Sequence, residues 1–400
     1  MSVIALVDWQ SVGHHQMYLG LITKAFLEQG HQVLACSPKP EALQEFIRRT
    51  IPQAEANLVT QQLTERHDNA AVIQPFREEL TAKGARRWEE TLNVLNAATA
   101  RSGLVPDFVF FPKLDAWLQG IWTSAAAERF PYPWSGIYFH PLHFRQPLAY
   151  MPLRRGWLEP DAVLRTSRCY AVAALDEFVA VKLHRKIGKP VFHFPDITDE
   201  SAPDLSLPVV QEIQRLAKGR KIVGLLGALE DRKGIFTLLE AAKKAVGESY
   251  FFLFAGESVM GESDMKKFIA GSKKAEENCY FQPGRIADEK AFNSLVALCD
   301  VIFAVYKGYP FSSNLMTKAA LMRKPILVAT GALLESRVLR YRTGLAVPEQ
   351  DSDAVLAAIR TVSGADYTQS VQPQYETYFA QHSREQLGHV LAGILSASGI

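Results

Sequence analysis

Residues 2–38, "SVIALVDWQSVGHHQMYLGLITKAFLEQGHQVLACSP", decide the fold. The first nine read as a buried strand that runs into a polar turn. Gly30 stands where the C-cap of a helix belongs, and "QVLACSP" resumes as a strand. Between them, apolar residues recur at helical spacing: Met17, Leu21, Ile22, Ala25 and Phe26. A strand–helix–strand unit of this kind predicts a parallel sheet with right-handed crossovers.

The alternation of apolar runs and helical segments continues along the chain. "DFVFFPKLDAW" and "WSGIYFHP" read as further strands, whereas residues 40–100 read mostly as polar helix. A second series begins at "KIVGLLG" and continues through "SYFFLFAGE", "DVIFAVY" and "PILVAT". We therefore expect an α/β fold of two doubly wound halves. The expected boundaries are a first domain at 1–198, a linker at 199–215, a second domain at 216–368, and a helical tail at 369–400 that packs back on the first domain.

Composition limits the classes of partner. The 400 residues carry a net charge of +2, which gives no broad positive field for nucleic acid. Four cysteines stand without C-x-x-C spacing, and this pattern favours a reducing compartment. No signal peptide pattern and no apolar run near the roughly 18 residues of a membrane span occurs. We expect a cytoplasmic protein without a transmembrane segment or nucleic-acid partner, and peripheral contact with a membrane stays open.

The stretch "GALEDRKGIFTLLEAA", residues 227–242, carries the first candidate site. In doubly wound sheets, ligands bind beyond the carboxyl ends of the strands. Arg232 and Lys233 follow a glycine-rich strand end and precede a helix that begins near Gly234. Two cations beside the amides of a helix N-terminus make a diphosphate site. The alternative interpretation is a pair of exposed loop charges.

Taken in order, five segments resemble the GT-B-fold glycosyltransferases of the large family 4 group. They are "G…RKG…LLEA" at 227–241, "LFAGE" at 253–257, "FQPGRIADEKAFNSLVALCDVIFAVY" at 281–306, "TGLAVPEQD" at 343–351 and "GHHQMYLGLITKAFLEQGHQV" at 13–33. The resemblance covers most of the chain and is weakest between 40 and 100. It implies two Rossmann-like domains that face each other across a cleft, an N-terminal one for the acceptor and a C-terminal one for the donor.

The resemblance also implies an activity. A hexosyltransferase-like enzyme would move a sugar from a nucleoside diphosphate-sugar, with UDP or GDP as the carrier, to a hydroxyl of a small-molecule, glycan or lipid-linked acceptor. The reaction would be retaining and metal-independent, with the nucleotide-sugar as co-substrate and no further cofactor. The residues placed at the donor by this resemblance are Gly13, Gly227, Arg232, Lys233, Glu257, Arg285, Ile286, Ser312, Ser313, Asn314 and Leu315.

One segment, "KGYPFSSNLMTKAALMRKP" at 307–325, departs from the family pattern. The resembled enzymes commonly hold the donor with two glutamates separated by seven residues, and these positions fall on Pro310 and Lys318 here. Neither residue accepts a hydrogen bond as a carboxylate does. What remains is the Ser312–Asn314 stretch at a helix N-terminus, where amides attract phosphate. Simple N-capping is the alternative, because serine and asparagine favour that position.

Histidines near two strand ends complete the candidate site. Gly13 lets the loop approach a ligand, and His14 or His15 would act as a base or a hydrogen-bond donor, the other being structural. His140 matches a position where similar enzymes often place a histidine near the donor sugar. The expected catalytic residues are therefore His14, His140, Arg232 and Lys233. We expect no metal, because these histidines lack suitable carboxylate partners in sequence.

Two other functions remain open. A sugar-nucleotide epimerase of the same shape would need acid and base groups that flank the sugar, and the sequence offers no convincing set of carboxylates. A non-catalytic subunit that binds a nucleotide-sugar would account for the missing glutamates. Retention of "EDRKG" favours the transferase.

Overall fold

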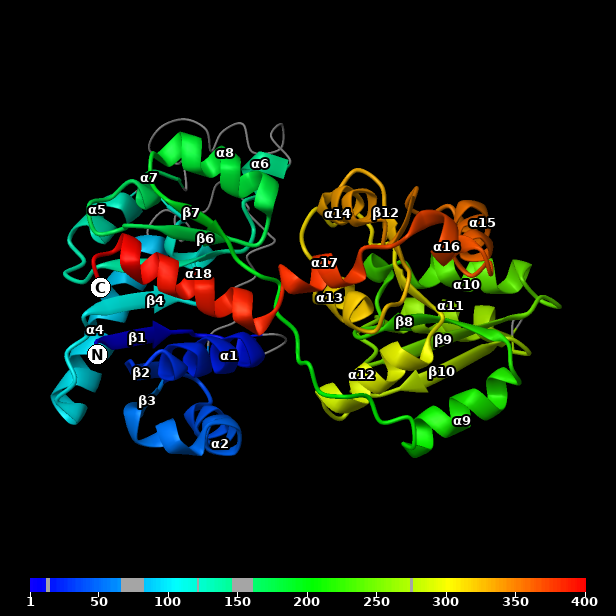
Figure 1. Cartoon of the computed structure of the whole chain (residues 1–400), viewed down its shortest axis with the longest axis horizontal. Helices are drawn as coiled ribbons and strands as arrows, with labels where there is room; N and C mark the ends of the chain where they lie inside the picture. The colour runs from blue at the N-terminus through cyan, green and yellow to red at the C-terminus, as the bar shows by residue number, and fades with distance from the viewer. Residues whose placement is uncertain (12–14, 66–82, 121, 146–160, 274–275) are drawn as a thin grey trace. The chain divides into compact units, whose positions relative to one another are not determined.

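The computed structural model describes residues 1–11, 15–65, 83–120, 122–145, 161–273 and 276–400 (Figure 1). The chain forms two compact units. Unit 1 comprises residues 1–195 and 383–400, and unit 2 comprises residues 196–382. Unit 2 is therefore inserted between two parts of the chain that fold together.

Unit 1 is built on a seven-stranded sheet whose neighbouring strands are all parallel. The strand order is β3-β2-β1-β4-β5-β6-β7. The strands are β1 (Val3–Val7), β2 (Gln32–Ser37), β3 (Leu58–Gln62), β4 (Phe108–Phe111), β5 (Trp134–Tyr138), β6 (Val172–Ala174) and β7 (Val191–His193). The described helices are α1 (His15–Glu28), α2 (Pro40–Thr50), η1 (Pro52–Asn57), α4 (Lys83–Ser102), η2 (Asp115–Trp117), α5 (Thr123–Glu128), α6 (Leu142–Arg145), α7 (Asp161–Leu164), α8 (Glu177–Ile187) and α18 (Arg384–Ala397).

Helices cover both faces of this sheet. On one face, Trp88 of α4 packs among Phe111, Phe130 and Trp134, with ring centroids 5.3, 5.0 and 4.8 Å away. On the other face, Phe26 of α1 meets the ring of Phe110. The C-terminal helix α18 packs against α1 and β7, as Figure 1 shows in red. Burial on both faces explains why the central strands are almost continuously apolar.

Unit 2 has a six-stranded parallel sheet in the order β10-β9-β8-β11-β12-β13. Its strands are β8 (Lys221–Leu226), β9 (Tyr250–Gly256), β10 (Cys279–Pro283), β11 (Val301–Ala304), β12 (Ile326–Ala329) and β13 (Gly344–Val347). Helices α9 (Pro208–Ala217), α12 (Glu289–Leu298), α13 (Asn314–Leu321), α14 (Leu333–Tyr341) and α17 (Tyr375–Ala380) share one core. Helices α10 (Ile235–Lys244), α11 (Glu262–Ser272), α15 (Ser352–Val362) and α16 (Tyr367–Val371) share the core of the opposite face, and η5 (Asp231–Lys233) precedes α10.

The expected α/β class with two doubly wound parallel sheets is confirmed. One strand was not expected: β3, "LVTQQ", lies in the stretch read as polar helix. Among the described strands it pairs with β2 alone and is partly exposed, so its sequence lacks the apolar run of a central strand. The range 199–215, expected to be a linker, contains most of α9, whose Val210 and Ile213 are buried in unit 2.

Each sheet has one switch point, at which the order of the strands reverses: the strands on one side of it follow the chain outward in one direction, and those on the other side follow it in the opposite direction. In unit 1 this point lies between β1 and β4, and in unit 2 between β8 and β11. Loops that leave the two central strands there turn to opposite faces and leave a crevice, where ligands bind in sheets of this kind. None of the described helices combines the length and the hydrophobicity that crossing a bilayer requires.

The aromatic cluster around Trp88 should carry much of the stability of unit 1. Trp88→Ala should lower its free energy of unfolding by about 3–5 kcal/mol, because a large buried side chain would leave a cavity. Trp122, whose side chain is 67% exposed, provides the matched control, and Trp122→Ala should change stability by less than about 0.5 kcal/mol. Urea denaturation measures both, and equal effects would contradict the assignment of the core.

Candidate functional site

The loop after β8 lies close to the end of β9 because two glycines face each other there. Gly256 has a φ of +143°, and a Cβ on it would lie only 1.8 Å from the carbonyl oxygen of Gly227. Gly227 itself has a φ of +97°, and a Cβ there would lie 2.8 Å from Nζ of Lys233. A side chain at either position would push the loops apart or displace the lysine. The glycines therefore place Lys233 against the carboxyl end of β8.

Lys233 is the candidate anion-binding group. Its half-buried ammonium donates to the carbonyl of Leu226, at 3.3 Å, and lies 5.6 Å from the ring centroid of Tyr306. Across the described residues no carboxylate contacts this ammonium. A partly desolvated cation paired only with a carbonyl and an aromatic ring has electrostatic capacity left for an anion.

Arg232 lies differently from its neighbour. Its guanidinium forms an ion pair with Glu230 and lies 5.2 Å from the ring centroid of Tyr309. Its backbone oxygen accepts from the amide of Lys307, at 2.8 Å, which ties this loop to the loop after β11. Glu230 already compensates the charge of Arg232, whereas no carboxylate among the described residues contacts Lys233. The two cations therefore differ in how readily they would bind an anion.

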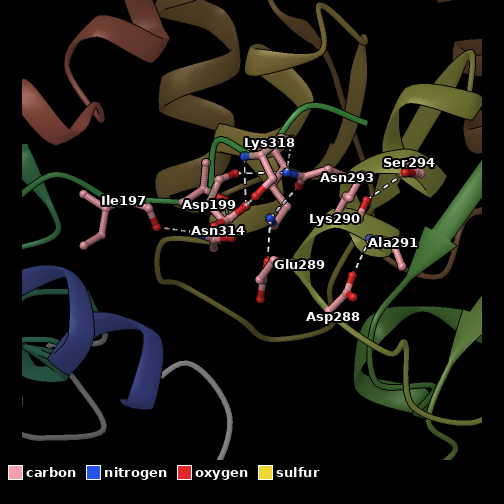
Figure 2. A network of polar contacts seen from close by, with 12 residues as sticks. Ile197, Asp199, Asp288, Glu289, Lys290, Ala291, Asn293, Ser294, Asn314 and Lys318 are labelled. Carbon is pink, nitrogen blue, oxygen red and sulfur yellow. Dashed lines mark hydrogen bonds and ion pairs between the residues drawn. The ribbon is translucent and has the colours of Figure 1, made fainter. Parts of the chain in front are cut away.

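The side chains of Ser312 and Asn314 contact the segment by which the chain enters unit 2. The hydroxyl of Ser312 donates to the carboxylate of Asp196 and accepts from Arg337. The side-chain nitrogen of Asn314, Nδ2, donates to the backbone carbonyl of Ile197 (Figure 2). Both side chains are buried, so they anchor this segment, and their expected contact with a donor remains a prediction.

Three further polar groups belong to the same end of unit 2. Ser313 is the N-cap residue of α13, but its hydroxyl lies 3.3 Å from that of Tyr306 and caps no amide. The backbone amide of Asp196, in turn, donates to Nδ1 of His382, at 2.9 Å. The first and the last residue of unit 2 are thus bonded to each other, next to the loop before α13.

The remaining donor residues expected from the resemblance are spread over this end of unit 2. Glu257 follows β9 and is exposed, and its carbonyl accepts from the amide of Leu229, at 2.8 Å. Arg285 is exposed beyond β10. Ile286 and Leu315 pack with the same core cluster, where Leu315 is buried. Their roles in donor binding stay predictions.

Lys318 occupies one of the positions where the resembled enzymes carry a glutamate. Its side chain is buried, and Nζ donates to Oε2 of Glu289, at 2.7 Å, and to Oδ1 of Asn293, at 2.8 Å (Figure 2). Asn293 in turn donates to the carbonyls of Asp199 and Ser201, at 3.1 and 2.9 Å. Lys318 therefore joins α13 to α12, and Asn293 joins α12 to the segment that enters unit 2.

In unit 1, His140 follows β5 and is held by a buried carboxylate that the sequence did not reveal. Asp115 accepts from the amides of Phe139 and His140, at 3.0 and 2.8 Å, and its Oδ1 lies 3.3 Å from Nδ1 of His140. Burial alone would raise the pKa of Asp115, but the hydrogen bond and charge of His140, with the charge of Lys113, hold that pKa below its usual range. An ionised Asp115 holds the backbone of residues 139–140 and lies beside the imidazole of His140.

Two expected site residues, Gly13 and His14, lie outside the described residues. The carboxylate partner of His140 was missed because it follows a different strand, β4, and only the parallel pairing of β4 with β5 brings the two loops together. Within the described ranges, no group of three or more His, Cys, Asp or Glu side chains is arranged to hold a metal ion.

Comparison with known proteins defines the fold. No protein-family model matches the chain, and no curated protein does either. Solved structures match over the full length of both chains. A glycosyltransferase from Rickettsia africae has 13% identity and a TM-score of 0.65, covering 99% of this chain and 98% of its own. The chain has the GT-B fold.

Two other GT-B structures extend the comparison. HepE from Anabaena, solved in complex with UDP and glucose, has 17% identity and a TM-score of 0.63, with 99% of this chain and 100% of its own covered. Sucrose-phosphate synthase from Thermosynechococcus elongatus has 16% identity and a TM-score of 0.67, with 99% and 98% covered. The expected resemblance is thus confirmed for the fold. Within this GT-B fold, Lys233 and Asp115 each follow a strand at the switch point of their own sheet.

The surroundings of Lys318 lead to a prediction. Lys318→Glu should lower the stability of unit 2 by about 3–5 kcal/mol, because a buried carboxylate would face Glu289 and the oxygen of Asn293. Nucleotide affinity should not rise. Lys266→Glu, at a side chain 74% exposed on α11, is the control for the change in charge. Thermal unfolding and nucleotide titration provide the test, and a tighter nucleotide complex at unchanged stability would contradict it.

Proposed function

We propose that this protein is a glycosyltransferase that moves a sugar from a nucleoside diphosphate-sugar to a hydroxyl acceptor. The observation that carries the proposal is the ammonium of Lys233, half-buried beside the switch point of unit 2 and in contact with no carboxylate among the described residues. A diphosphate is the anion that such a site in a doubly wound sheet suits. HepE was solved in complex with UDP and with UDP-glucose, and this supports a UDP-sugar as the donor.

The roles follow from the contacts. Negative charge builds on the diphosphate as its bond to the sugar breaks, and Lys233 stabilises that charge. Arg232 assists after exchanging Glu230 for phosphate, since its guanidinium suits both anions. His140, held by Asp115, lies near the transferred sugar, as the resemblance implies.

Other features of the proposed reaction rest on the resemblance. The transfer proceeds with retention of configuration, without a metal ion and without a cofactor beyond the nucleotide-sugar. The acceptor is a small molecule, a glycan or a lipid-linked sugar, and the enzyme works in the cytoplasm without a nucleic-acid partner.

A ligand screen tests the donor class directly. UDP, GDP and their hexose conjugates should be added to the full chain, and the matching nucleotide should stabilise it by roughly 2.7 kcal/mol at a hundred times its dissociation constant. Hydrolysis of the bound donor would distinguish an enzyme from a nucleotide-sugar-binding subunit. Formation of a new glycoside would distinguish a transferase from an epimerase. If no nucleotide changes the melting temperature, the proposal fails.

The unequal surroundings of the two cations give a kinetic prediction. Lys233→Met should lower kcat/KM for the donor by roughly thirty- to a thousand-fold, as expected when a charge-assisted contact worth about 2–4 kcal/mol is lost. Arg232→Met should have a smaller effect, because Glu230 competes for its charge.

Lys244→Met is the matched control. This lysine is exposed on α10 and pairs with Asp353, so its loss should leave the kinetics unchanged. Steady-state kinetics of donor turnover compare the three variants. A Lys233→Met enzyme with normal kcat/KM would place the diphosphate elsewhere.

A further inference from the structure

A second cluster of ionisable side chains lies at the switch point of unit 1. Asp8 directly follows β1, Lys113 follows the adjacent parallel strand β4, and His15 begins α1. Nδ1 of His15 lies 3.0 Å from Oδ2 of the buried Asp8. On the opposite side of the ring, Nε2 lies 3.3 Å from Nζ of Lys113. The three side chains thus form one chain of contacts that passes through the imidazole.

The two partners of His15 determine which of its ring nitrogens carries the hydrogen. An ionised carboxylate only accepts, so Nδ1 of His15 donates to Asp8. An ammonium only donates, so Nε2 accepts from Lys113. The backbone amide of Gln10 donates to the other oxygen of Asp8, at 3.0 Å, and this keeps the carboxylate in place. The lone pair of Nε2 therefore points at the lysine.

Lys113 is held loosely. It donates to Oε1 of Gln10 and to His15, both at 3.3 Å, which is longer than the roughly 2.9 Å typical of such bonds. These are neutral acceptors, and within the described parts of the chain no carboxylate contacts this ammonium, which has a third hydrogen to donate. The contact between Lys113 and His15 is thus the one that a ligand atom can replace most easily.

We propose that Lys113 and His15 bind a hydroxyl group of the acceptor. The hydroxyl oxygen accepts a hydrogen bond from Lys113, and the hydroxyl hydrogen is donated to Nε2 of His15. An alcohol satisfies both groups, since it accepts and donates at one atom. An ether or an ionised phosphate cannot donate to Nε2, and an ammonium would be repelled by the lysine. This inference rests on the proposed function, and it makes Asp8 a positioning residue for His15.

Binding can be measured without turnover. In the full chain labelled with ¹⁵N-histidine, glycerol should shift the Nε2 resonance of His15 saturably. The ether 1,2-dimethoxyethane, which accepts but does not donate, should not. Lys113→Met should abolish the response to glycerol. An equal shift with the ether, or no shift with glycerol, would overturn the assignment.

Kinetics separate this inference from the proposed function. With a donor that the wild-type chain turns over and glycerol as the acceptor, His15→Asn and Lys113→Met should each raise the acceptor KM by about tenfold, the worth of one strong hydrogen bond. The donor KM should stay unchanged. His184→Asn, at an exposed histidine on α8, is the control.

Failure of the proposed function and failure of the acceptor assignment give different results. If the wild-type chain neither binds nor turns over any nucleotide-sugar, the proposed function fails. If it does so and both variants keep the wild-type acceptor KM, the acceptor assignment alone is wrong. Asp8→Asn should raise the acceptor KM as His15→Asn does, because the ring would lose its orientation.

Discussion

Parallel strand pairing at the centre of each sheet is the constraint on which both candidate sites depend. Parallel neighbours end at the same edge, so the residues that follow β1 and β4, or β8 and β11, meet although they are far apart in sequence. The crossovers on the two sides of the switch point run to opposite faces, and this leaves the strand ends uncovered. Lys233 in unit 2 and the Asp8–His15–Lys113 cluster in unit 1 occupy these positions. Neither group could form if the central strands were antiparallel.

Buried polar groups join α12 and α13 to the segment by which the chain enters unit 2. Lys318 donates to the side chain of Asn293, whose own side-chain nitrogen donates to the backbone carbonyls of Asp199 and Ser201. Asn314 donates to the carbonyl of Ile197. A buried ammonium is stable only when its hydrogen bonds are made, and Glu289 and Asn293 make them here. The lysine therefore fixes the position of α12 against α13.

Sequence reasoning predicted the fold well because buried parallel strands are apolar on both faces. It failed for β3, an edge strand whose glutamines resemble those of a surface helix. It selected the loop of Arg232 and Lys233 because the motif is local, and the role of this loop stays a prediction. It did not find Asp115 or the partners of Ser312, because those contacts join residues separated by 25 and 116 positions. Side-chain direction at a strand end is set by the neighbouring loops, and one sequence without the fold does not contain that information.

The return of α18 to unit 1 has a consequence for biosynthesis. The ribosome releases all of unit 2 before α18, so unit 1 lacks the helix that covers α1 and β7 until α18 itself has been synthesised. Unit 2 is continuous from Asp196 to His382, and the hydrogen bond between these two residues closes it. The inserted unit can therefore finish folding on the nascent chain while the unit that encloses it in sequence still exposes an apolar surface. The chain order thus allows unit 2 to complete its fold before unit 1, although unit 1 begins first in the sequence.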